Sequence, residues 1–149
     1  MQGATTDLAM GKISIVGRVE FANILAGYDV NLSAVNGDAQ IGAVSVGGDW
    51  VASNLVAGAK NAASGNTNFG NGSDASIGAG SAGIVAKIAS ITIAGQVFGT
   101  PKSVSTTDHF GFVAQQIGAV KIGGNSIVLT AGLDNLAVGE TSDMTVHEV

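Results

Sequence analysis

The chain has 149 residues, of which 46% are hydrophobic and only 11% are charged. Disorder requires low hydrophobicity together with high net charge, and neither is present. A chain of this length can bury a sizeable core, so we expect one domain over residues 1–149. The net charge is −5 and Lys plus Arg number only six, which excludes a basic surface for nucleic acid.

Glycine fills 23 positions, proline one and cysteine none. Glycine weakens helices, and the abundant Val and Ile lose side-chain freedom in them, so this composition favours strands joined by tight turns. The lack of cysteine excludes disulfides and is compatible with the cytosol and with many bacterial secreted proteins. No apolar run is long enough for a membrane span, so we expect none.

The first predicted strand is ISI at residues 13–15, which precedes Val16 and Gly17. Its alternation of apolar, polar and apolar residues is typical of a half-buried strand. The string ANILAG at 22–27 comes next, followed by a second alternating stretch, YDVNLSAV, at 28–35. The first unit therefore consists of a strand, a glycine turn, a second short strand and an Ala-Gly pair.

The same unit returns further along the chain. The string IGAVSVGG at 41–48 is followed by SNLVAG at 53–58. At 117–124 the chain reads IGAVKIGG, which repeats six of the eight letters of the earlier string. The string LTAG at 129–132 is predicted to be a third version of the ANILAG segment. The repeat is thus longer than a single strand.

Two shorter copies complete the repeat: ITI at 91–93 and the weaker MTV at 144–146. Successive copies lie 31, 47, 29 and 24 residues apart, which indicates an irregular repeat with insertions. Such units, built from short strands and glycine corners, are typical of solenoids. We therefore predict an all-β fold, a parallel β-helix (β-solenoid) of about five irregular coils. The alternative is a β-sandwich whose strands merely share alternation and turns.

In a parallel β-helix each coil stacks on the previous one at about 4.8 Å, so an interior position must match its neighbours in size. The residues predicted to face inward are Ile13, Ile15, Val44, Val46, Ile91, Ile93, Val120, Ile122, Met144 and Val146. The residues predicted to face solvent are Ser14, Ser45, Thr92, Lys121 and Thr145. Glycine returns where the chain needs a positive φ or where two backbones approach closely. The only helix expected is a short turn within 75–90.

Two segments break the repeat and are predicted to be loop insertions, residues 59–83 and residues 100–109. The first contains GNTNFGNGSD at 65–74, where side-chain oxygens alternate with glycine turns. Calcium takes six to eight oxygen ligands from flexible loops of this kind, and it is the only cofactor the sequence suggests. The candidate ligands are Asn66, Asn68, Asn71 and Asp74. The alternative is a set of hydrogen-bonded Asx turns.

No catalytic constellation is visible, so we expect no enzymatic activity. The only histidines, His109 and His147, form no HxH or HExxH motif, and no GxSxG elbow is present. Glycan-cleaving β-helices gather carboxylates on one strand face, whereas the outward column here reads Ser, Ser, Thr, Lys and Thr. A Thr-rich face suggests ice binding, but Lys121 interrupts the column. A polysaccharide-active enzyme and an ice-binding protein remain the weaker alternatives.

The strings ANILAGYDVNL, IGAVSVGGDWVASNLVAG, IASITIAGQVFGT and HFGFVAQQIGAVKIGG resemble the repetitive β-solenoid regions of bacterial surface and secreted proteins. These proteins include adhesins and autotransporter-like passengers. The resemblance implies an extracellular or cell-surface location and a structural or adhesive role. A glycan or a cell-surface protein would then be the partner.

The alternative function is a carbohydrate-binding module that uses loop aromatics and the 59–83 insertion. The larger aromatics of the coils are Phe21, Tyr28, Trp50, Phe98, Phe110 and Phe112. They are expected either to stack on sugars or to fill gaps in the core. A solenoid also has two open ends with unpaired strand edges. We therefore expect either capping of these ends by aromatic or loop residues, or end-to-end self-association.

Overall fold

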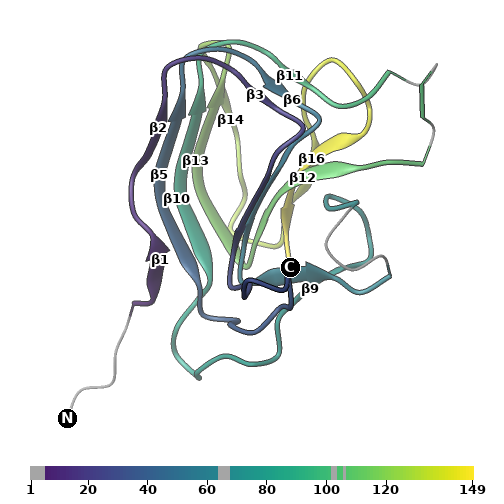
Figure 1. The fold of residues 1–149 in the computed structure, drawn as a ribbon. Coiled ribbons are helices and arrows are strands. Elements are labelled where there is room, and N and C mark those ends of the chain that lie inside the picture. Colours follow the sequence, from purple (N-terminus) through teal and green to yellow (C-terminus); the bar gives the residue numbers. More distant parts are fainter. Residues whose placement is uncertain (1–5, 64–67, 102–103, 106) are drawn as a thin grey trace.

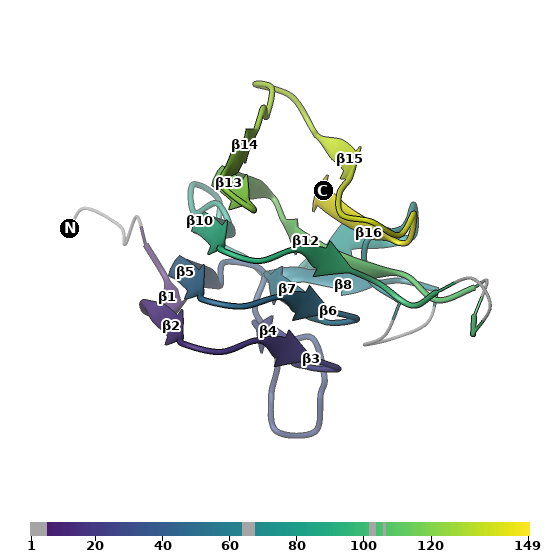
Figure 2. The same ribbon diagram turned by 90° about the horizontal axis from the view of Figure 1, so that it is seen from above.

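A computed structural model describes residues 6–63, 68–101, 104–105 and 107–149. These residues contain sixteen strands and no helix, so the fold is all-β. The chain winds through successive coils that lie side by side (Figure 1). Seen from above, the stack runs from β1 and β2 at one end to β14 and β15 at the other (Figure 2). Within the described ranges no helix could cross a lipid bilayer.

The first sheet contains the repeat strings. Its strands are β1 (Leu8–Met10), β2 (Ile13–Ile15), β5 (Gln40–Val46), β10 (Lys87–Ile93), β13 (Gln116–Ile122) and β14 (Asn125–Ile127). Both β1 and β2 pair with β5, and the order continues through β10 and β13 to β14. Every pair is parallel except the last, because β14 runs antiparallel to β13.

Two further sheets complete each coil. The second sheet contains β3 (Val19–Glu20), β6 (Trp50–Val51) and β11 (Val97–Phe98). The third sheet contains β4 (Asn23–Ala26), β7 (Asn54–Ala57), β12 (Phe110–Ala114), β16 (Met144–Glu148) and, antiparallel at its edge, β15 (Asn135–Ala137). A separate hairpin is formed by β8 (Ala59–Asn61) and β9 (Asp74–Ser76).

The register of the first sheet aligns the repeat strings residue by residue. The central apolar positions follow one another as Ile13, Val44, Ile91 and Val120, and the last three are at most 1% exposed. The polar positions between the apolar ones align as Ser14, Ser45, Thr92 and Lys121 and are exposed. The predicted interior ladder is therefore confirmed. The fold is a parallel β-helix of about four turns rather than five, and its parallel pairing excludes the β-sandwich.

Two predicted repeat copies lie elsewhere in the fold. The string MTV belongs to β16, which pairs with β12 in the third sheet, so it adds no fifth strand of the ISI type. Its apolar residues Met144 and Val146 do face the core. The third strand of the ANILAG type is β12, where Phe112 pairs with Leu55 of β7, so LTAG is not the third version of this segment. Alternation predicts that a strand is half-buried, but it does not say which sheet the strand joins.

The predicted insertions differ in structure. The 59–83 segment is not wholly a loop, because it contains the β8–β9 hairpin. The 100–109 segment connects β11 to β12, and its described residues form no strand. Residues 75–90 contain the end of β9 and the start of β10 in place of the expected helical turn. The alternating stretch at 28–35 is a connection with a single bridge, Tyr28 to Ala34.

Glycine occupies the corners for both predicted reasons. Gly27 and Gly58 follow β4 and β7, where the chain leaves the third sheet, and their φ angles are +102° and +58°. L-residues with a side chain rarely adopt such values. At Gly47, a Cβ atom would collide with the carbonyl oxygen of Val16 in the neighbouring coil. Gly27 and Gly58 therefore allow the chain to turn, and Gly47 allows neighbouring coils to stack closely.

The core runs through all the coils, and two aromatic residues fill it. Trp50 and Phe112 are fully buried, with ring centroids 5.2 Å apart and an interplanar angle of 60°. The indole Nε1 of Trp50 donates to the Ser53 carbonyl oxygen at 2.9 Å, so burial leaves no polar atom of this ring unpaired. These two rings therefore serve packing and are not available to a ligand.

The interior ladder predicts that substitutions at neighbouring positions of β10 change the free energy of unfolding by very different amounts. Ile91→Ala should lower the free energy of unfolding by about 2–5 kcal/mol, because it leaves a cavity between Val44 and Val120. Thr92→Ala, on the exposed side of the same strand, should change it by no more than about 0.5 kcal/mol. Urea unfolding followed by circular dichroism measures both values. Similar losses at the two positions would contradict the ladder.

Candidate functional site

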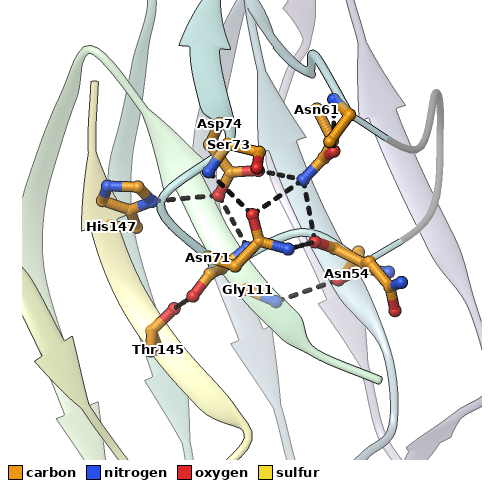
Figure 3. A network of polar contacts seen from close by, with 11 residues as sticks. Asn54, Asn61, Asn71, Ser73, Asp74, Gly111, Thr145 and His147 are labelled. Carbon is orange, nitrogen blue, oxygen red and sulfur yellow. Dashed lines mark hydrogen bonds and ion pairs between the residues drawn. The ribbon is translucent and has the colours of Figure 1, made fainter. Parts of the chain in front are cut away.

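The 59–83 insertion packs on the third sheet through a buried polar network (Figure 3). The Asp74 side chain is fully buried at its centre. One carboxylate oxygen, Oδ2, accepts from the Gly70 N–H at 2.7 Å and lies 2.9 Å from Nδ1 of His147. The other oxygen, Oδ1, accepts from Asn61 Nδ2 at 3.1 Å. Asp74 thereby joins the hairpin to β16, 73 residues further along the chain.

The structure brings three of the four candidate calcium ligands together, and the fourth, Asn66, lies outside the described residues. The Asn71 side-chain oxygen accepts from the Ser73 N–H at 2.8 Å, which is an Asx turn, and from Asn61 Nδ2 at 3.1 Å. The Asn68 side-chain oxygen accepts from the His109 N–H at 3.2 Å. The side-chain oxygens of Asn68 and Asn71 therefore accept from N–H donors, as the interpretation as hydrogen-bonded Asx turns predicts.

Sequence reasoning missed the partners of this loop. Asn61, Thr145 and His147 are distant in sequence from 65–74, and none of them belongs to a recognisable motif. Thr145 donates its hydroxyl proton to the Gly70 carbonyl oxygen at 2.7 Å. The available signal was the alternation of β16, which places Thr145 and His147 on the side opposite the core residues Met144 and Val146. The insertion covers that side, so these polar residues are packed rather than solvated.

Tyr28 lies beside the same network. Its hydroxyl donates to the Ala59 carbonyl oxygen at 2.9 Å, which links the first coil to the hairpin. Burial of the ring raises the pKa of Tyr28 to about 12, and the negative charge of Asp74 acts in the same direction. The protonated phenol is thus favoured by its surroundings and by the hydrogen bond that it donates.

A second polar corner lies beside the 100–109 segment. Asp143 accepts from the Thr100 N–H at 2.7 Å through Oδ2. Among the described residues, three buried atoms there have no hydrogen-bond partner: Asp108 Oδ1, His109 Nδ1 and Asp143 Oδ1. Across the described part of the chain, however, no three His, Asp or Glu side chains are grouped closely enough to hold a metal ion. The corner therefore does not have the geometry of a metal site.

The N-terminal coil leaves one end of the solenoid uncovered. Among the described strands, β2, β3 and β4 pair on one side only, with β5, β6 and β7. Ile13 and Ile24 are only partly buried, although their partners Val44 and Leu55 in the second coil are at most 1% exposed. An apolar hollow of about 410 Å³ opens here and is lined in part by Ile24 and Leu25. The 28–35 connection also lines this hollow, through Tyr28, Asp29 and Leu32, so this end of the core is partly open.

The opposite end has a different structure. The antiparallel strands β14 and β15 lie against β13 and β16 and close the parallel stack (Figure 2). Five exposed large hydrophobic side chains lie within the first coil and its connection to the second. They are Leu8, Val16, Phe21, Val30 and Leu32, each more than half exposed. Val128 and Leu133 are exposed at the opposite end, so the two ends differ in strand pairing rather than in the presence of exposed hydrophobic side chains.

No family model, curated protein or solved structure compared with this chain matches it. Three places on the molecule are candidates for a functional role. These are the polar network of the insertion, the open N-terminal coil and the aromatic residues that remain at the surface. Among the six larger aromatic residues of the coils, Phe21 is the most exposed at 78%, whereas Trp50 and Phe112 belong to the core.

The titration of Tyr28 can be followed by its absorbance alone, because Tyr28 is the only tyrosine. Its phenolate absorbance should appear with a midpoint near pH 12 in the folded protein and near pH 10 in denaturant. The folded form binds the proton more tightly, so the contribution of Tyr28 to stability should be constant below pH 10 and be lost between pH 10 and 12. Tyr28→Phe should remove this part of the alkaline loss. A native midpoint near pH 10 would contradict the buried hydrogen bond.

Calcium should not raise the thermal midpoint, because the oxygens of Asn68, Asn71 and Asp74 already accept N–H donors. Melting by far-UV circular dichroism, with chelator and then with millimolar Ca²⁺, measures the difference. Glu140→Gln, an exposed carboxylate elsewhere, is the control for Asp74→Asn. If Ca²⁺ raised the thermal midpoint by several degrees in the wild type and in Glu140→Gln but not in Asp74→Asn, calcium binding would be established instead.

Proposed function

We propose that this chain is a non-enzymatic structural or adhesive module of a bacterial surface or secreted protein. The observation that supports the proposal best is the open N-terminal coil on a solenoid whose opposite end is closed. A module of this kind works as a rigid segment that stacks on a matching surface. Its location would be extracellular or on the cell surface, as the resemblance to adhesin-like repeats implies.

Rigidity follows from the way the coils are joined. The first three coils contribute strands to all three sheets, the fourth contributes to the first and third, and parallel pairing connects neighbouring coils. The interior columns between the sheets are buried and apolar, so neighbouring coils cannot slide without burying a mismatched side chain. Contacts with a partner would then be made at the corners and at the open end, while the coils hold these places at fixed positions.

The open end favours association between copies. Unpaired strand edges readily accept further strands, and here they surround partly exposed Ile13 and Ile24. A partner must offer strand edges to several sheets at once together with an apolar centre. The N-terminal coil of a second copy offers both, whereas the other end of the chain presents the antiparallel edges of β14 and β15. We therefore propose that two copies meet through their N-terminal coils.

A second candidate function is carbohydrate binding, the alternative reading of the aromatic residues. One specific observation favours it: Phe21 is an exposed aromatic side chain beside a hollow that also contains amide groups. A glycan or a cell-surface protein would be the partner of the adhesive form of the module. The hollow lies on the N-terminal coil beside the edge strand β4, so glycan binding and the dimer involve neighbouring surfaces.

Light scattering coupled to gel filtration tests the association. The wild-type chain should elute with twice the mass of a single chain at micromolar concentration. Ile24→Lys should yield a monomer, because a lysine on the open edge blocks strand addition. Leu133→Lys, an exposed apolar residue at the other end, should leave the dimer intact. Circular dichroism confirms that each variant is folded. A wild-type monomer, or equal effects of the two variants, would refute the proposed interface.

A further inference from the structure

A hollow of about 240 Å³ lies beside the corner between the second and third sheets. It is lined by two aromatic side chains, Phe21 and Phe110, three amides, Asn23, Asn54 and Asn68, and two alanines. None of these residues is charged. The hollow is smaller than the range of about 300–1,000 Å³ that is typical of pockets for drug-sized ligands, so it fits a small group.

Phe21 is held in an unfavourable backbone conformation at the surface. Its φ is +49°, the left-handed region, which is a genuine outlier for a bulky residue. Ala52, at the equivalent position of the next coil, has a φ of +42° but is only 4% exposed. Phe21 is 78% exposed, so burial of its ring does not offset the strain. Strained residues of this kind concentrate at binding sites, where the position of the side chain matters.

The amides of the hollow are held at fixed positions by the coils. Asn54 donates from Nδ2 to the Asn23 side-chain oxygen at 2.7 Å, and its own oxygen accepts from the Gly111 N–H at 2.9 Å. These bonds connect three coils and orient both amides. Asn23 is exposed and accepts through its side-chain oxygen, so its N–H₂ group is not used in this bond. A ligand would meet a preformed donor beside an aromatic ring.

We propose that this hollow binds one neutral sugar ring of a glycan. The apolar C–H face of a sugar can stack on Phe21, while its hydroxyl groups can accept from and donate to the amides. The uncharged lining favours a neutral sugar over a uronic acid. The proposal rests on the adhesive form of the proposed function and names its partner. The hollow adjoins the proposed dimer interface, because Asn23 and Ile24 are neighbours in β4, so each variant is also checked for its mass by light scattering.

The test uses isothermal titration calorimetry of the full chain with cellohexaose, mannohexaose and xylohexaose as neutral probes. A hexamer of galacturonic acid is the anionic probe. At least one neutral oligosaccharide should bind with a dissociation constant in the millimolar range or below, and at least tenfold more tightly than the anionic one. Phe21→Ala and Asn23→Ala should each weaken that binding at least fivefold, whereas Phe21→Trp should retain it. Leu133→Ala, another exposed apolar residue, is the control.

Phe21→Gly separates binding from folding. Glycine adopts the left-handed conformation without strain, so this variant should melt no lower than the wild type and yet lose binding. The absence of binding by every neutral probe would overturn the proposal. Equal binding by Phe21→Gly and the wild type would also overturn it. A dimer that forms normally in a chain without glycan binding would leave the structural role standing and remove only the adhesive one.

Discussion

The fold depends on one constraint, the in-register stacking of apolar side chains inside the solenoid. Ile91 illustrates it, since it lies between Val44 and Val120 and is fully buried. Its two partners are 47 and 29 residues away in the sequence, so chain segments of very different length must return to the same place. Backbone pairing sets the spacing of the coils, and the matched size of Val and Ile keeps the interior free of cavities and overlaps.

The same constraint leaves the rest of the molecule free to vary. A coil tolerates an insertion at a corner as long as the chain re-enters the stack in register, because lengthening a loop costs little entropy. The 59–83 insertion uses this freedom and packs its hairpin against the third sheet through Asp74 and His147. Polar groups that would otherwise face water on β16 are satisfied inside this network. The corner at Phe21 is a second such place, because its side chain is exposed and does not pack in the core.

Much of the coil structure could be predicted from the sequence, because interior ladders impose the same alternation at each copy. The strings at Ile13, Val44, Ile91 and Val120 therefore identified both the fold and the buried faces. Other features depend on three-dimensional neighbours that a local pattern does not encode. MTV has the alternation of the first sheet but joins the third, and the partners of Asp74 come from distant strands. The strain at Phe21 had no sequence signal, since a left-handed turn usually carries glycine or asparagine.

The most direct test of the account is a methyl NMR experiment on the full chain with labelled Ile and Val. The stacked register predicts nuclear Overhauser effects in a single chain of contacts, from Ile13 to Val44, from Val44 to Ile91 and from Ile91 to Val120. It predicts none directly between Ile13 and Val120, which lie three coils apart. Contacts that instead join neighbouring strands in an antiparallel order, as in a β-sandwich, would contradict the solenoid and the functional proposals built on it.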